Sequence, residues 1–178
     1  MSRVLTFSRV FPSYHPRAGE PTQFVEKIWK GLSRIERRDG EYSIYDKFPK
    51  YYPGLEQWKF PIEWRSSWKD LQPKYHTIRA GHRWKAGDWF SPRVWSGKPY
   101  ASKQIAIAPD IQIKKTWDFK ITEDGLFNID GNLYAYSSSM EALDKLANND
   151  GLDQGDFLNW FPRSFNGQIL SWNDKIEY

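Results

Sequence analysis

The chain is 178 residues long, carries a formal net charge of +4 and contains no cysteine, while aromatic residues make up 17% of it. This length fits one domain with a substantial hydrophobic core, and the lack of cysteine excludes disulfides, thiolate metal sites and cysteine nucleophiles. No run approaches the ~20 apolar residues of a membrane helix and no signal peptide is evident, so we expect a cytoplasmic protein that does not enter a membrane.

The N-terminal part of the sequence predicts a strand, a turn-rich link and a helix. The strand is expected over residues 4–7, and an amphipathic helix over 22–37, where apolar residues recur at helical spacing. Residues 41–72 follow neither a helical nor a strand period, and tyrosine, tryptophan and phenylalanine alternate there with charges and prolines. We interpret 39–72 as an insertion held by ring packing, with a base-stacking platform as the alternative.

The remainder of the sequence predicts short strands, followed by two helices and a last strand. Strands are expected over 75–79, 89–95, 104–108 and 111–121, and only Lys115 interrupts the alternation of the last one. Asp124-Gly125 and Asp130-Gly131 are hairpin turn signals. With no repeat and no linker, residues 1–178 are predicted to form a single α+β domain, a small mixed β-barrel with flanking helices.

The helices of the C-terminal part have their own signals. Ser138 and Glu141 have capping-box spacing, and Gly151 suits a helix end. The expected buried stripe of this helix consists of Met140, Leu143, Leu146 and Ala147. A shorter helix is expected over about 153–161, and a closing strand over 168–172.

Positive charge and aromatic rings are concentrated in residues 74–104, which hold seven Lys and Arg residues, three Trp, two Tyr and one acid. This composition is typical of a surface that neutralises phosphates and stacks bases, although a solvated basic face is the alternative. The candidate binding residues are His76, Arg79, Arg83, Trp84, Arg93, Trp95, Lys98, Tyr100 and Lys103. The three histidines lack matched carboxylates, so we expect no metal site, and no glycine-rich phosphate motif indicates a cofactor.

Several short motifs follow one another in a definite order: VLTF at 4–7, PTQFVEKI at 21–28, KYHTIR at 74–79, RWKAGD at 83–88, NNDGLDQGDFLNWF at 148–161 and GQILSW at 167–172. In this order they resemble the ASCH domain family of the PUA-like superfamily, and VWSGKPYASKQ at 94–104 is similar to a segment of phage-borne members. The resemblance implies a PUA-like β-barrel whose cleft handles RNA or a modified nucleobase.

The same resemblance implies a possible enzyme. Some ASCH proteins are similar to an amidohydrolase of N4-acetylcytidine, which uses a lysine, a threonine three residues later and a carboxylate, and another is described as a ribonuclease. The matching positions here are Lys74, Thr77 and Asp150. At the position of Asp150 the relative has glutamate. A buried lysine can act as the base for a threonine hydroxyl, but residues three apart in a strand face opposite sides, so Lys74 would have to precede the strand.

Three functions therefore remain open at the level of sequence. The first is a binding protein for RNA or a modified nucleobase, and the second is a hydrolase that uses Lys74, Thr77 and Asp150. The third is an interaction protein in which residues 41–72 contact another protein. We expect no cofactor, and a monomer is assumed.

Overall fold

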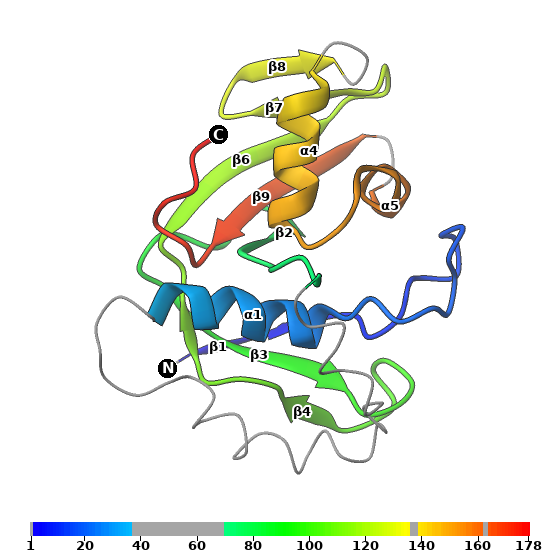
Figure 1. Ribbon diagram of the computed structural model, residues 1–178, viewed down its shortest axis with the longest axis vertical. Coiled ribbons are helices and arrows are strands. Elements are labelled where there is room, and N and C mark those ends of the chain that lie inside the picture. Colours follow the sequence, from blue (N-terminus) through cyan, green and yellow to red (C-terminus); the bar gives the residue numbers. More distant parts are fainter. Residues whose placement is uncertain (1, 37–69, 136–138, 162–163) are drawn as a thin grey trace.

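The computed structural model describes residues 2–36, 70–135, 139–161 and 164–178, so most of the predicted insertion at 39–72 and the predicted cap Ser138 lie outside the described residues. The described residues form three helices and nine strands, which are arranged in two mostly antiparallel sheets (Figure 1). This confirms the predicted α+β class. The strand pairing among these residues does not close into a barrel.

The first sheet contains the N-terminal strand. It is formed by β1 (Arg3–Thr6), β3 (Trp89–Trp95), β4 (Gln104–Ala106) and β5 (Ile111–Gln112). β1 runs parallel to β3, whereas β4 and β5 pair with β3 in the antiparallel sense. Phe90 and Val94 are completely buried, whereas Trp89 is 49% exposed. β3 therefore has one face in the core and one face turned outward.

The second sheet has the strand order β2-β9-β6-β7-β8. Its strands are β2 (His76–Ala80), β6 (Lys115–Ile121), β7 (Leu126–Ile129), β8 (Asn132–Ala135) and β9 (Phe165–Ser171). Asp130 and Gly131, with φ of 48° and 92°, form the turn between β7 and β8. Two successive positive φ angles are characteristic of a type I′ hairpin turn, as the Asp-Gly signal predicts.

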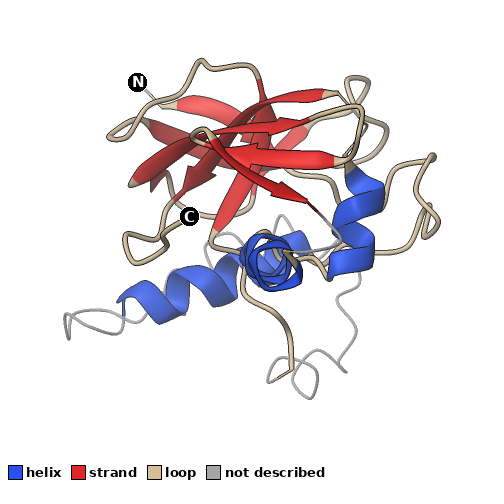
Figure 2. Ribbon diagram, turned by 90° about the horizontal axis from the view of Figure 1, so that it is seen from above, coloured by secondary structure: helices blue, strands red, loops and turns tan. Residues whose placement is uncertain are grey.

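Three helices lie on one side of the strands, as Figure 2 shows. α1 (Phe24–Glu36) packs into one core cluster with both sheets, while α4 (Met140–Asn149) and α5 (Gln154–Trp160) pack with the second sheet in another. α4 ends at Gly151, as the sequence predicts, and this glycine has a φ of 74°. The Gly151 N–H donates a hydrogen bond to the Asn148 carbonyl, and the Leu152 N–H donates one to the Ala147 carbonyl. These two bonds are a Schellman motif. The prediction that Met140 is buried is wrong, because it is 56% exposed at the first turn.

The predicted strand over 111–121 is in fact two strands in different sheets. β5 pairs with β3 in the first sheet, and β6 pairs with β7 and β9 in the second. Between them the Ile113 N–H bonds the carbonyl of Asp88, and the Lys114 N–H bonds that of Ser171. The interruption of the alternation at Lys115 thus coincides with the passage of the chain from one sheet to the other.

Candidate functional site

A buried ion pair joins two residues that are 76 positions apart in the sequence. The Nζ of Lys74 donates a hydrogen bond to Oδ1 of Asp150 at 2.6 Å and a second one to the main-chain carbonyl of Asp150. The two side chains are 1% and 5% exposed. The structure therefore brings together the predicted lysine and carboxylate and seals them from water.

The backbone around this pair explains why the two residues meet. The Lys74 N–H bonds the carbonyl of Lys27 in α1 at 2.8 Å, and the Tyr75 N–H bonds the carbonyl of Asn149 at the end of α4 at 2.8 Å. Position 31 of α1 is glycine, and a Cβ there would overlap the carbonyl oxygen of Lys74. The segment before β2 is thus held between α1 and α4, and Lys74 lies before the strand rather than in it.

Burial dominates the electrostatics of the pair. Desolvation lowers the pKa of Lys74 to about 8 even though Asp150 opposes the shift. Burial also raises the pKa of the Asp150 carboxyl, against the attraction of Lys74, Arg79 and Lys27. The Nζ of Lys74 lies 4.2 Å from the centroid of the Phe24 ring. An amine in this environment loses its proton more readily than a surface lysine does.

His76 is the third titratable group of this cluster. Its Nε2 lies 3.2 Å from the carbonyl oxygen of Leu146, so Nε2 must be the donor and Nδ1 is unprotonated in the neutral ring. Nδ1 has no hydrogen-bond partner in the part of the chain that the structure describes, and it lies 3.6 Å from Oδ1 of Asp150. Burial, followed by the charge of Lys74, lowers the pKa of His76 well below its ordinary value. With its ring fully buried, His76 is not placed to contact an RNA strand directly.

Thr77 and Arg79 lie on the opposite face of β2 from His76. Arg79 is half-buried, donates from Nη2 to the carbonyl of Thr6 at 2.8 Å and lies over the Phe7 ring. Its Nε finds no hydrogen-bond partner among the described residues. Desolvation lowers the pKa of Arg79 to about 10. Thr77 is 5% exposed, and its hydroxyl makes no hydrogen bond within the described part of the chain. The structure thus does not join Thr77 to Lys74 directly.

The predicted basic and aromatic residues fall into buried and exposed sets. Trp84 is 4% exposed, packs in the first core cluster and carries the Arg3 guanidinium 3.9 Å above its ring, so no face is free for a base. Trp95 is half-buried, and its ring centroid lies 5.3 Å from that of Tyr100, which is 91% exposed. Arg93 is half-buried, while Arg83, Lys98 and Lys103 are exposed.

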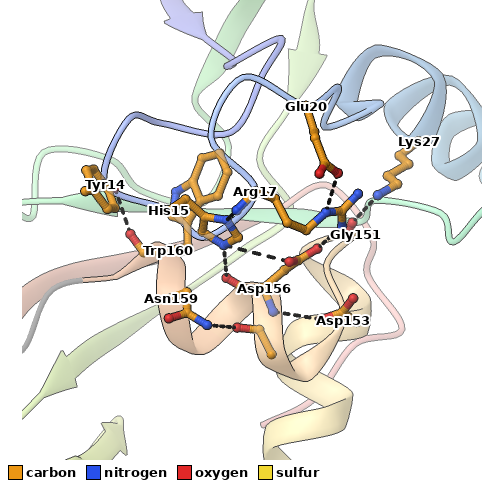
Figure 3. A network of polar contacts seen from close by, with 11 residues as sticks. Tyr14, His15, Arg17, Glu20, Lys27, Gly151, Asp153, Asp156, Asn159 and Trp160 are labelled. Atoms are coloured by element: carbon orange, nitrogen blue, oxygen red, sulfur yellow. Dashed lines mark hydrogen bonds and ion pairs between the residues drawn. The ribbon is translucent and has the colours of Figure 1, made fainter.

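A second polar network, which the sequence did not reveal, joins the loop before α1 to α5 (Figure 3). His15 is buried, accepts at Nδ1 from the Arg17 N–H and donates from Nε2 to the carbonyl of Asp156. Arg17 bonds the Asp156 carboxylate at 2.5 Å and that of Glu20 at 2.8 Å. The distance of 139 residues between Arg17 and Asp156 explains why no local pattern indicated this contact.

Lys27 links this network to the neighbourhood of Lys74. Its Nζ donates to the carbonyl of Gly151 at 2.7 Å. Burial lowers the pKa of Lys27, and the negative charges of Asp156 and Asp150 oppose this shift. Figure 3 shows Lys27 reaching the loop between α4 and α5 from α1. Lys27 thus ties the main chain beside Asp150 to α1 and lies within the electrostatic reach of the Arg17–Asp156 network.

Comparison of the chain with models of known protein families, with characterised proteins and with solved structures finds no match. No group of three or more His, Cys, Asp or Glu residues in the described ranges is arranged to hold a metal ion. Within the same residues, no helix is both long enough and apolar enough to cross a membrane.

Proposed function

We propose that this chain binds RNA or a modified nucleobase and that it is a PUA-like protein of the ASCH type. The observation that carries the proposal is a surplus of positive charge: Arg83, Arg93, Lys98 and Lys103 form no ion pair within the described part of the chain. Such cations are free to neutralise phosphates. Trp95 and Tyr100, whose ring centroids are 5.3 Å apart, belong to the same strand and loop as Arg93, Lys98 and Lys103 and supply rings for stacking.

The proposal is tested by titrating a labelled single-stranded RNA pool at several salt concentrations. We expect Lys98→Ala/Lys103→Ala to weaken binding and to flatten the dependence of log K on log salt by about 0.7 for each phosphate that is no longer neutralised. The control is Lys120→Ala/Lys175→Ala, which removes the same charge from exposed positions outside the 74–104 stretch. Equal reductions in affinity in both double variants, or no binding by the wild type, would contradict the proposal.

A second candidate function, hydrolysis of an N-acylated cytidine or cleavage of RNA, is favoured by the buried Lys74–Asp150 pair. Strongly shifted pKa values cluster at catalytic sites. In the amidohydrolase reaction, neutral Lys74, which makes no hydrogen bond to Thr77 in this structure, would have to approach the Thr77 hydroxyl and take its proton as the hydroxyl oxygen attacks the acyl carbon. The cytosine amine would leave with that proton, and water would then cleave the threonine ester.

This candidate is tested by incubating the protein with N4-acetylcytidine and measuring released cytidine. We expect the rate to rise as the pH passes through about 8, where Lys74 loses its proton, and to level off above it. Lys74→Ala should abolish the release. Thr77→Val keeps the size of the side chain without its hydroxyl and should abolish it as well. Release that survives Lys74→Ala would exclude this mechanism, and RNA cleavage that depends on His76 would favour the ribonuclease form.

A further inference from the structure

The outward face of β3 carries aromatic rings and a cation in a row. Along the strand, Phe90, Pro92 and Val94 point into the core, so Trp89, Ser91, Arg93 and Trp95 share the other face. Ser91 is only 9% exposed, so the accessible members of this row are Trp89, Arg93 and Trp95. Trp89 is 49% exposed although tryptophan usually buries most of its surface. At about 3.3 Å per residue, the two tryptophans stand about 20 Å apart with Arg93 between them.

The strands on either side of β3 extend this face without adding an acid. Val4 and Thr6 of β1 lie opposite Ser91 and Arg93. On the other side, β4 and β5 place uncharged residues beside the row: Gln104 opposite Trp95, Ala106 opposite Arg93 and Gln112 opposite Trp89. Val4 is 41% exposed. The neighbouring residues on these strands are half-buried: Thr6, Gln104, Ala106 and Gln112. The outward face of the first sheet, defined by these nine residues, thus has one positive charge and no negative one.

The loop between β3 and β4 continues the row beyond Trp95. Tyr100 is 91% exposed and has a φ of 63°, which costs a non-glycine residue energy. Internal hydrogen bonds hold the loop in this shape, from Gly97 N–H to the Ser102 hydroxyl, from that hydroxyl to the Lys98 carbonyl, and from Ser96 N–H to the Lys103 carbonyl. The loop therefore holds the Tyr100 ring beside Trp95 and presents two lysines with it.

We infer that the outward face of the first sheet is a binding platform for a single-stranded nucleic acid. Bases stack on Trp89 at one end and on the Trp95–Tyr100 pair at the other, while Arg93, Lys98 and Lys103 contact phosphates between and beyond them. Bases within a duplex hide their faces in the stack, so exposed rings on a sheet suit an unpaired strand. Because none of the nine residues of this face carries a carboxylate, the face does not repel the phosphates of a nucleic acid.

This inference rests on the proposed binding of RNA and assigns it to particular residues. It gives a direct role to Trp89, which the sequence analysis did not single out, and none to Trp84 or His76, which are buried. It is separate from the Lys74–Asp150 pair, which lies where α1, α4 and the start of β2 meet. The proposal of hydrolysis at Lys74 and the proposal of base stacking on the first sheet can therefore be refuted independently of each other.

The experiment measures the affinity of a labelled single-stranded RNA for the wild type and for Trp89→Ala, Trp95→Ala and Trp89→Phe. Removal of one stacking ring should weaken binding on the order of 5- to 100-fold. Trp89→Phe keeps a ring and should recover most of that affinity. Tyr14→Ala is the matched control, because Tyr14 is an exposed ring at 66% on a different loop. Thermal unfolding of each variant confirms that it is folded.

A second oligonucleotide, in which abasic sites replace the bases, keeps the charge and removes the stacking partners. We expect it to bind the wild type weakly, and we expect Trp89→Ala to have no further effect on it. If both tryptophan variants bind intact RNA as the wild type does while Lys98→Ala/Lys103→Ala does not, RNA binding stands and this face is excluded. If a duplex competes as well as a single strand, the inference is likewise overturned, and no binding by the wild type refutes both proposals.

Discussion

Replacing Lys74 with methionine should destabilise the protein strongly. The substitution keeps most of the apolar volume but leaves Asp150, 3% exposed, without its partner. Removing one member of a buried ion pair costs about 3–5 kcal/mol, because the remaining charge is desolvated without compensation. Urea unfolding at pH 7, followed by circular dichroism, measures the free energy of unfolding.

The chain offers a matched control for this prediction. Lys115 also forms an ion pair, with Glu177, but the two side chains are 30% and 72% exposed. Lys115→Met should therefore change the free energy of unfolding by about 0–1 kcal/mol, as exposed ion pairs do. A destabilisation below about 1 kcal/mol in Lys74→Met, or equal destabilisation in both variants, would show that water reaches the Lys74–Asp150 pair in solution.

The pH dependence of the same experiment follows from the pKa of Lys74. That pKa is about 8 in the folded protein and 10.5 in an unperturbed lysine. Between these values the unfolded chain binds more protons, so the stability contributed by this group is complete above pH 10.5 and is lost as pH falls through 8. Raising the pH from about 8 to about 9.5 should stabilise the wild type by about 1–2 kcal/mol relative to Lys74→Met. A constant difference across this range would contradict the shifted pKa.

Three further substitutions, each followed by urea unfolding, test the backbone at the site, at the start of α5 and in the β7–β8 turn. Gly31→Ala should cost about 1–3 kcal/mol because its Cβ would overlap the Lys74 carbonyl, whereas Gly155→Ala, with no atom nearer than 3.4 Å, should cost nothing. Asp153→Ala removes the carboxylate that caps α5 through the Asp156 N–H at 2.7 Å and should cost about 1 kcal/mol. Gly131→Ala should cost about 1–2 kcal/mol because its φ is 92°. A neutral result for Gly31→Ala or Gly131→Ala would show that the backbone adjusts there.

The sequence predicted local structure well where one signal dominated. The Asp130-Gly131 turn, the end of α4 at Gly151 and the strand over 89–95 all depend on neighbouring residues, and all are present. The passage from one sheet to the other near Lys115 could not be predicted, because a strand that changes its partner keeps its β conformation on both sides. The burial of Trp84 also depended on contacts distant in sequence, since Arg3 covers its ring.

The sequence predicted the surroundings of some candidate residues better than those of others, because these surroundings also depend on contacts distant in sequence. The pairing of Lys74 with Asp150 was implied by resemblance alone, and the structure brings the two together, whereas the alternation of β2 turns Thr77 away from His76. The sequence suggests that Arg79 is a surface cation, but the residue is half-buried, because the Thr6 carbonyl accepts a hydrogen bond from its guanidinium. Composition thus indicated the presence of a basic and aromatic surface, while only the fold decides which of its members are exposed.

The Lys74–Asp150 pair still requires an explanation beyond stability. Two apolar residues of similar volume in place of a buried ion pair often leave a protein equally or more stable. Lys74→Met/Asp150→Leu should therefore recover most of the stability that Lys74→Met loses. If the double variant is as stable as the wild type and still binds RNA but releases no cytidine, folding and binding do not require the two charges, and their presence in the core is best explained by chemistry at this site. If the double variant is as unstable as Lys74→Met, the hydrogen bonds of Lys74 to α4 are structural, and the pair gives no support to the hydrolase.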